Sequence, residues 1–151
     1  VLADFFGEWA KLDGKDHYKD IEHKEKSLDL IRKHPTFWTK LPLLPHAMDL
    51  LHFIKDHYGE YYILSKPLEG DPRSEPGKRA WIREHLQSVM PSRMIFTADK
   101  QRYAYVGGRP NILIDDFGKN IDLWKMNGGI GIKYRPYKYQ ETIKILRGLA
   151  K

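Results

Sequence analysis

The chain has 151 residues, enough for one domain with its own hydrophobic core, and 41% hydrophobic with 30% charged residues is typical of a globular protein in water. No apolar run is long enough to cross a membrane, and no secretory signal pattern stands at the start. Cysteine is absent, which excludes disulfides and thiolate metal sites. We therefore expect a cytoplasmic protein with no membrane partner. The net charge of +6 favours anionic partners, but acidic and basic residues are interleaved, so we do not expect nucleic acid to be one of them.

The first part of the chain predicts short helices and polar connections. An apolar, aromatic stretch at 1–12 predicts a helix, a very polar stretch at 13–26 predicts an exposed loop or helix surface, and a second helix is expected at 27–34. Prolines then punctuate an apolar connection up to residue 45. The aromatic residues Phe5, Phe6 and Trp9 indicate either a core-facing stripe or a wall for a flat ligand, and core packing is the more common role.

From residue 46 onwards, the patterns predict alternating helices and strands. Helices are expected at 46–58, 77–89, 120–126 and 140–149, and short buried strands at 61–64, 93–96, 111–114 and 130–134. A loop is expected at 68–76, and a glycine-rich loop or hairpin at 101–110. This alternation is typical of an α/β protein whose parallel sheet carries helices on both faces.

Polar side chains follow three of the expected strands. Ser65 and Lys66 follow the first, Lys100 follows the second, and Asp115 and Asp116 follow the third. Because parallel strands place their carboxyl ends on one side of a sheet, we expect these groups to gather there. A hydroxyl, ammonium groups and paired acids suit the binding of a phosphate beside Mg²⁺. The alternatives are plain turns at Ser65-Lys66 and a turn or helix cap at the acids.

The two adjacent acids are the strongest candidates for metal ligands. Like charges raise each other's pKa, and a hard cation such as Mg²⁺ relieves that repulsion with few protein oxygens. Lys78 is a further candidate, because a lysine in the first turn of the helix expected at 77–89 opposes the helix dipole and suggests a functional role. The seven histidines form no ligand pattern, and we interpret them as surface or core residues.

Taken in order, these segments resemble the haloacid-dehalogenase-like phosphatases and, among them, the 5′(3′)-deoxyribonucleotidases. The resemblance runs over nearly the whole chain. It rests on Phe37-Trp38-Thr39-Lys40-Leu41-Pro42 with Pro45-His46-Ala47, on Tyr62-Ile63-Leu64-Ser65, on Lys78 and Lys100, and on Ile112 to Asp116 followed by Asn120, Trp124 and Gly128-Gly129. The last of these segments is the most specific match.

The resemblance implies a fold and a reaction. The fold is a Rossmann-like parallel sheet flanked by helices, a haloacid-dehalogenase-like core in a single domain 1–151, with a small helical cap inserted at about 8–45. The reaction is Mg²⁺-dependent hydrolysis of (deoxy)nucleoside 5′-monophosphates to nucleoside and phosphate through an aspartyl-phosphate. The resemblance leaves a homodimer open.

The resemblance also implies roles for individual residues. The implied phosphate ligands are Ser65, Lys66, Lys78 and Lys100, the implied metal ligands are Asp115 and Asp116, and the implied contacts to the substrate base are Phe5, Phe37 and Trp38.

One family motif is not in this chain. The first motif, Asp-x-Asp-Gly, supplies the nucleophile and the general acid and would immediately precede Val1, and Asp4 matches only the acid that follows it. We therefore expect the sequence to begin inside a longer natural chain. The alternatives are a non-catalytic phosphate-binding or structural descendant of the fold, and a phosphatase acting on nucleic-acid ends.

Overall fold

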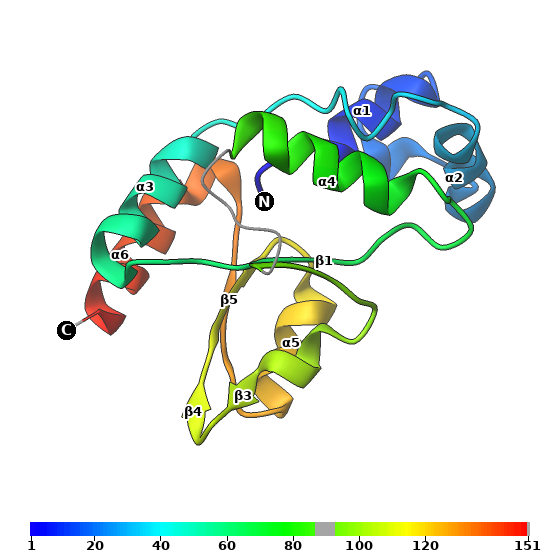
Figure 1. Cartoon of the computed structure of the whole chain (residues 1–151). Helices are drawn as coiled ribbons and strands as arrows, with labels where there is room; N and C mark the ends of the chain where they lie inside the picture. Colours follow the sequence, from blue (N-terminus) through cyan, green and yellow to red (C-terminus); the bar gives the residue numbers. More distant parts are fainter. Residues whose placement is uncertain (87–92, 151) are drawn as a thin grey trace.

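The computed structural model describes residues 1–86 and 93–150 and has a mixed α/β architecture (Figure 1). The α-helices are α1 (Phe5–Leu12), α2 (Lys24–Arg32), α3 (Ala47–Tyr58), α4 (Ser74–His85), α5 (Gly118–Met126) and α6 (Tyr139–Leu149). The strands are β1 (Ile63–Ser65), β2 (Met94–Phe96), β3 (Tyr105–Val106), β4 (Arg109–Pro110), β5 (Ile112–Asp115) and β6 (Ile130–Lys133). Short 3-10 helices are η1 (Tyr18–Asp20), η3 (Lys100–Tyr103) and η4 (Pro136–Lys138). The α/β class expected from the sequence is confirmed.

The expected buried strands form two parallel pairs. β1 pairs with β2, with Ile63 opposite Met94, and β5 pairs with β6, with Ile112 opposite Ile130. Each pair is a separate two-stranded sheet, whereas the sequence predicted one parallel sheet. Strands of three or four residues can be recognised from their apolar runs, but such a run does not specify which strand lies beside it. The glycine-rich segment forms the β3–β4 hairpin, one of its two expected forms.

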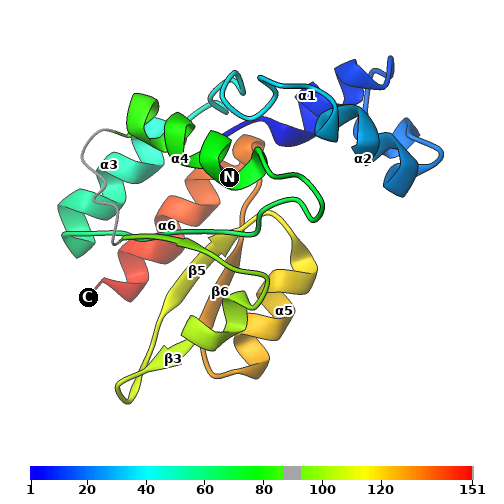
Figure 2. The ribbon, with the colours of Figure 1, turned by 45° about the vertical axis from the view of Figure 1, so that its right-hand side comes forward.

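Helices cover both faces of the β5–β6 pair. Successive strand residues point to opposite faces, so Ile114 and Ile132 pack with α3 and α6, while Leu113 packs against α5. Both views show α5 on one side of these strands and α6 on the other (Figure 2). This double cover explains why the residues of β5 from Ile112 to Ile114 form a continuous apolar run.

A second core lies under α1, α2 and α4. Trp9, Ile31, Trp38 and Trp81 are buried there, and α1 and α2 lie together beside one end of α4 (Figure 1). The first turn of α1 is capped by Asp4, whose side chain accepts a hydrogen bond from the Gly7 N–H at 2.9 Å. The small helical cap expected at about 8–45 covers α2 and most of α1, and it stays a prediction.

Helix α4 begins earlier than the sequence predicted. It starts at Ser74 rather than at residue 77, and Pro76 lies in its first turn. Proline is tolerated there because the first N–H groups of a helix have no acceptor within it. Lys78 therefore lies beyond the first turn, so the position predicted for it is wrong. Residues 87–89 of the predicted helix lie outside the described residues.

Within residues 1–86 and 93–150, none of the helices combines the length and the apolar character that crossing a membrane requires.

Two glycine substitutions test the packing of β5–β6. A Cβ at Gly129 would overlap the indole of Trp124, which is buried and donates a hydrogen bond to the Asn111 carbonyl at 2.9 Å. We expect Gly129→Ala to lower the free energy of unfolding by about 1–3 kcal/mol. A Cβ at Gly148, in α6, would have no other atom within 4 Å. Gly148→Ala should therefore raise the free energy of unfolding by up to about 1 kcal/mol. Urea denaturation measures both, and equal effects of the two variants would contradict the packing described here.

Candidate functional site

The carboxylate of Asp115, at the end of β5, is held by three donors. Lys100 Nζ and Asn120 Nδ2 donate to Oδ2 at 2.9 and 3.1 Å, and the backbone N–H of Phe117 donates to Oδ1 at 2.9 Å. The Lys100–Asp115 ion pair is largely shielded from solvent, with 15% and 7% of the two side chains exposed. Asp115 therefore joins β5 to η3 and to the start of α5.

The two adjacent acids have opposite pKa shifts. Burial raises the pKa of Asp115, but the charge of Lys100 and the three hydrogen bonds outweigh it, so the pKa lies below its ordinary value. Burial raises the pKa of Asp116, and the charge of Asp115 adds to this. Asp116 is therefore the acid whose charge the protein stabilises less well.

A second polar group lies at the end of β1. Lys78 Nζ, from α4, donates to Ser65 Oγ and to the carbonyl oxygen of Lys66, both at 2.7 Å. The Lys78 ammonium also lies 5.1 Å from the centre of the Trp38 ring. The side chain of Lys66 is exposed, so the structure uses this residue through its backbone.

The strand-end groups influence each other electrostatically. Burial lowers the pKa of Lys78 to about 8, and the nearby charge of Lys100 lowers it in the same direction. Two ammonium groups that repel each other in this way form a place where an anion would be stabilised. The structure thus pairs Lys78 with Ser65 and Lys100 with Asp115, and binding of phosphate by these residues stays a prediction.

The aromatic residues named from the resemblance lie in the interior. Phe37 and Trp38 are 5% and 4% exposed, and the ring of Phe5 stacks on Trp38 at 5.6 Å between centroids with 15° between planes. Phe5 is half-buried. Of the three, Phe5 is the one with a partly accessible ring, and contact of any of them with a substrate stays a prediction.

Two further residues support the site without having been assigned a role from the sequence. Asn120 was noted only as part of a motif, but it is a donor to Asp115. Asp71 is buried and accepts a hydrogen bond from the Trp38 indole N–H at 2.8 Å and one from the Arg73 N–H at 3.0 Å. An Asp just ahead of a helix start is a recognisable signal for a cap. That signal does not predict the hydrogen bond between Asp71 and Trp38, which is distant in the sequence.

The paired acids offer suitable ligands for Mg²⁺. Mg²⁺ takes oxygen ligands, commonly one or two carboxylates with waters or phosphate oxygens completing the set. In the part of the chain that the structure describes, no three acidic or histidine side chains gather in one place, so any metal beside Asp115 and Asp116 would need such additional ligands. The raised pKa of Asp116 is what a nearby cation would reverse.

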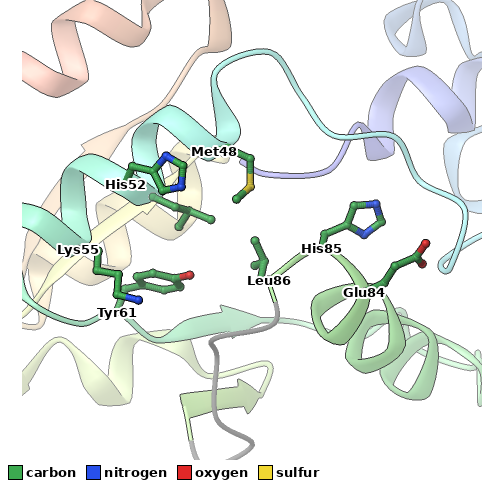
Figure 3. A pocket seen from close by; sticks show the side chains of 8 residues that line it. Met48, His52, Lys55, Tyr61, Glu84, His85 and Leu86 are labelled. Carbon is green, nitrogen blue, oxygen red and sulfur yellow. The ribbon is translucent and has the colours of Figure 1, made fainter.

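A pocket of about 330 Å³ lies elsewhere, between α3 and α4 (Figure 3). It is lined by Met48, Leu51, His52, Lys55, Tyr61, Glu84, His85 and Leu86. None of the strand-end side chains lines it, so it is separate from the candidate site.

Comparison with known proteins gives two curated relatives. Each carries the name "Putative 5′(3′)-deoxyribonucleotidase", and they come from Staphylococcus epidermidis strains ATCC 35984 and ATCC 12228. Each is 28% identical over 109 residues, which is 69% of this chain and 54% of the relative. The chain therefore spans about half the length of the curated relatives it matches. No family model matches the chain.

Neighbouring substitutions at the acids should have opposite effects on stability. The lowered pKa of Asp115 means that its charge stabilises the fold above the ordinary Asp range and that this contribution is lost as the pH falls. Asp115→Asn also leaves Lys100 unpaired, so we expect a loss of about 3 kcal/mol at pH 7 that shrinks below pH of about 4. The raised pKa of Asp116 has the opposite sign, and Asp116→Asn should raise stability at pH 7. Urea denaturation at several pH values with a chelator present measures both, and equal losses for the two variants would refute these pKa assignments.

Proposed function

We propose that this chain supplies the phosphate- and metal-binding groups of a Mg²⁺-dependent phosphatase that hydrolyses (deoxy)nucleoside 5′-monophosphates, on a haloacid-dehalogenase-like, Rossmann-like core. The observation that carries the proposal is that Lys78 donates to Ser65 at the end of β1 and Lys100 donates to Asp115 at the end of β5, with the charge of Lys100 lowering the pKa of Lys78. These are the groups that hold a phosphoryl group and neutralise its charge during transfer.

The phosphate would be held mainly by the two ammonium groups. Lys78 already donates to Ser65 and to the Lys66 carbonyl, and an ammonium has three N–H groups, so one remains for a phosphate oxygen. A phosphate would also offset the repulsion between Lys78 and Lys100. Ser65 Oγ accepts from Lys78, which leaves its own hydrogen free to donate to the same anion.

Asp115 and Asp116 would hold the metal. When bound, Mg²⁺ supplies positive charge to the phosphoryl oxygens, which is the Lewis-acid role of such ions in phosphoryl transfer. Asp115 is kept ionised and oriented by Lys100, Asn120 and the Phe117 N–H. Asp116 adds a second carboxylate whose charge the protein alone stabilises poorly.

In this proposal the nucleophile and the general acid are the two aspartates of an Asp-x-Asp motif that the residues described here do not supply. Its first aspartate attacks phosphorus, the nucleoside leaves with a proton from the second, and water then hydrolyses the aspartyl-phosphate.

The similarity to two proteins named as deoxyribonucleotidases supports a nucleotide as the substrate class. Phe5 is half-buried whereas Phe37 and Trp38 are buried, so Phe5 would be the aromatic residue that contacts a flat base. The base and the sugar are left unspecified, because an aromatic face stacks on any base.

Phosphate release by the full-length natural protein tests the proposal. We expect Mg²⁺-dependent release of inorganic phosphate from deoxynucleoside 5′-monophosphates. Asp116→Asn should abolish this release, because it removes one of the two proposed metal ligands. Asp122→Asn provides a matched control, since Asp122 is an exposed acid on α5, and it should keep full activity.

Two results would count against the proposal. Unchanged turnover in Asp116→Asn would refute the metal assignment. Phosphate binding without turnover by the full-length protein would indicate a non-catalytic phosphate-binding protein instead.

A further inference from the structure

A chain of contacts leads from the loop before α4 to the Lys78 ammonium. The Asp71 carboxylate accepts a hydrogen bond from Trp38 Nε1 at 2.8 Å, and the Trp38 ring lies 5.1 Å from Lys78 Nζ. Asp71 is 7% and Trp38 is 4% exposed, so water cannot easily replace this hydrogen bond. The orientation of the indole is therefore set by a buried carboxylate.

The position of Asp71 is itself fixed by its surroundings. Its second carboxylate oxygen accepts from the Arg73 N–H at 3.0 Å, and its backbone carbonyl accepts from the Ser74 N–H at 3.1 Å. Ser74 Oγ in turn accepts from the Leu68 N–H at 2.8 Å. These bonds tie Asp71 to the first turn of α4, the helix that also carries Lys78.

Helix α4 packs directly on Trp38. Gly77, the residue before Lys78, is buried, and a Cβ placed on it would lie 2.5 Å from the Trp38 Cβ. The backbone of α4 thus approaches the tryptophan more closely than any other residue type would allow. The ring of Phe5 stacks on the same indole.

We propose that Trp38 and Asp71 are positioning residues that hold the Lys78 ammonium at the end of β1, where it meets the phosphate. The indole face attracts the ammonium and limits its movement, while Ser65 Oγ and the Lys66 carbonyl accept two of its N–H groups. Asp71 acts through Trp38 rather than on Lys78 directly. This is a different role for Trp38 from the base contact implied by the resemblance.

Burial of Lys78 gives the inference a measurable property. Its pKa is lowered to about 8 from 10.5, first by burial and then by Lys100, the other charged group facing it. If the ammonium is released into solvent, its pKa must rise toward the ordinary lysine value. The pH at which Lys78 becomes reactive therefore reports whether it is held in place.

The first experiment compares three variants of the chain by competitive acetylation of lysines between pH 6.5 and 11, with the Lys78 peptide followed by mass spectrometry. In the unchanged protein the midpoint for Lys78 should be about 8. Trp38→Leu and Asp71→Ala should both move it upward. Trp9→Leu is the matched control, because Trp9 is 5% exposed, lies in the same core and also donates a buried indole hydrogen bond, to Ser27 at 3.0 Å. Its midpoint should stay at about 8.

An unchanged Lys78 midpoint in both Trp38→Leu and Asp71→Ala would overturn the proposal, and so would an equal shift in Trp9→Leu. Circular dichroism checks that each variant is folded. If Trp38→Leu does not fold, Trp38→Phe replaces it, since phenylalanine keeps an aromatic face but lacks the N–H that Asp71 accepts. Its midpoint should also shift upward, and no shift would again contradict the proposal.

The second experiment uses inorganic phosphate and rests on the proposed function. Calorimetric titration of the chain with phosphate should show binding about tenfold weaker in Trp38→Leu, because a charged hydrogen bond to the anion is lost. In a Lys78→Ala background, Trp38→Leu should add no further loss, since Trp38 acts through Lys78. Additive losses would overturn the positioning role. Absence of phosphate binding by the unchanged chain would count against the proposed function, while the acetylation profile would still decide the positioning claim.

Discussion

The buried ion pair between Lys100 and Asp115 is the interaction on which the arrangement of the strand ends depends. It connects η3, which follows β2, to the end of β5, and the same carboxylate holds the start of α5 through the Phe117 N–H and Asn120. Removing one partner of a buried ion pair lowers the free energy of unfolding more than replacing both partners with apolar residues does, because the remaining charge is left poorly solvated. Within residues 1–86 and 93–150, the β1–β2 and β5–β6 sheets share no backbone ladder, so side-chain contacts of this kind carry much of the connection between them.

The same pair also determines the electrostatic character of the site. Lys100 is paired with Asp115, yet its charge still lowers the pKa of Lys78. Of the two lysines, Lys78 is therefore the one whose positive charge the protein stabilises less well. An anion arriving there would raise that pKa again. Above pH of about 8, anion binding would therefore be accompanied by uptake of a proton from solvent at Lys78. Below that pH, Lys78 is already protonated before the anion binds. Protonation and anion binding are thus linked at one side chain.

Local patterns in the sequence predicted the elements better than their partners. Short runs rich in apolar residues identified β1, β2, β5 and β6, and in β5 the run is continuous because helices cover both of its faces. The polar groups that follow β1 and β5 were placed correctly for the same reason: a strand's end is visible where the apolar run stops. The start of α4 was missed because Pro76 was interpreted as a loop residue, although the first turn of a helix accepts proline. Ladder partners, and the contact between Asp71 and Trp38, depend on distant segments meeting, which no local pattern encodes.

The double cover of β5–β6 has a consequence for how the chain reaches its folded state. α3 and α6 close one face together, and Tyr58 Oη donates to the Leu146 carbonyl at 2.7 Å across 88 positions of sequence. During synthesis, α3 emerges long before α6, so its apolar side has no permanent neighbour for most of that time. Contacts between residues this far apart require a large loop to close, which slows folding. The core around Leu50 and Tyr134 can therefore exclude water only after α6 has packed against it.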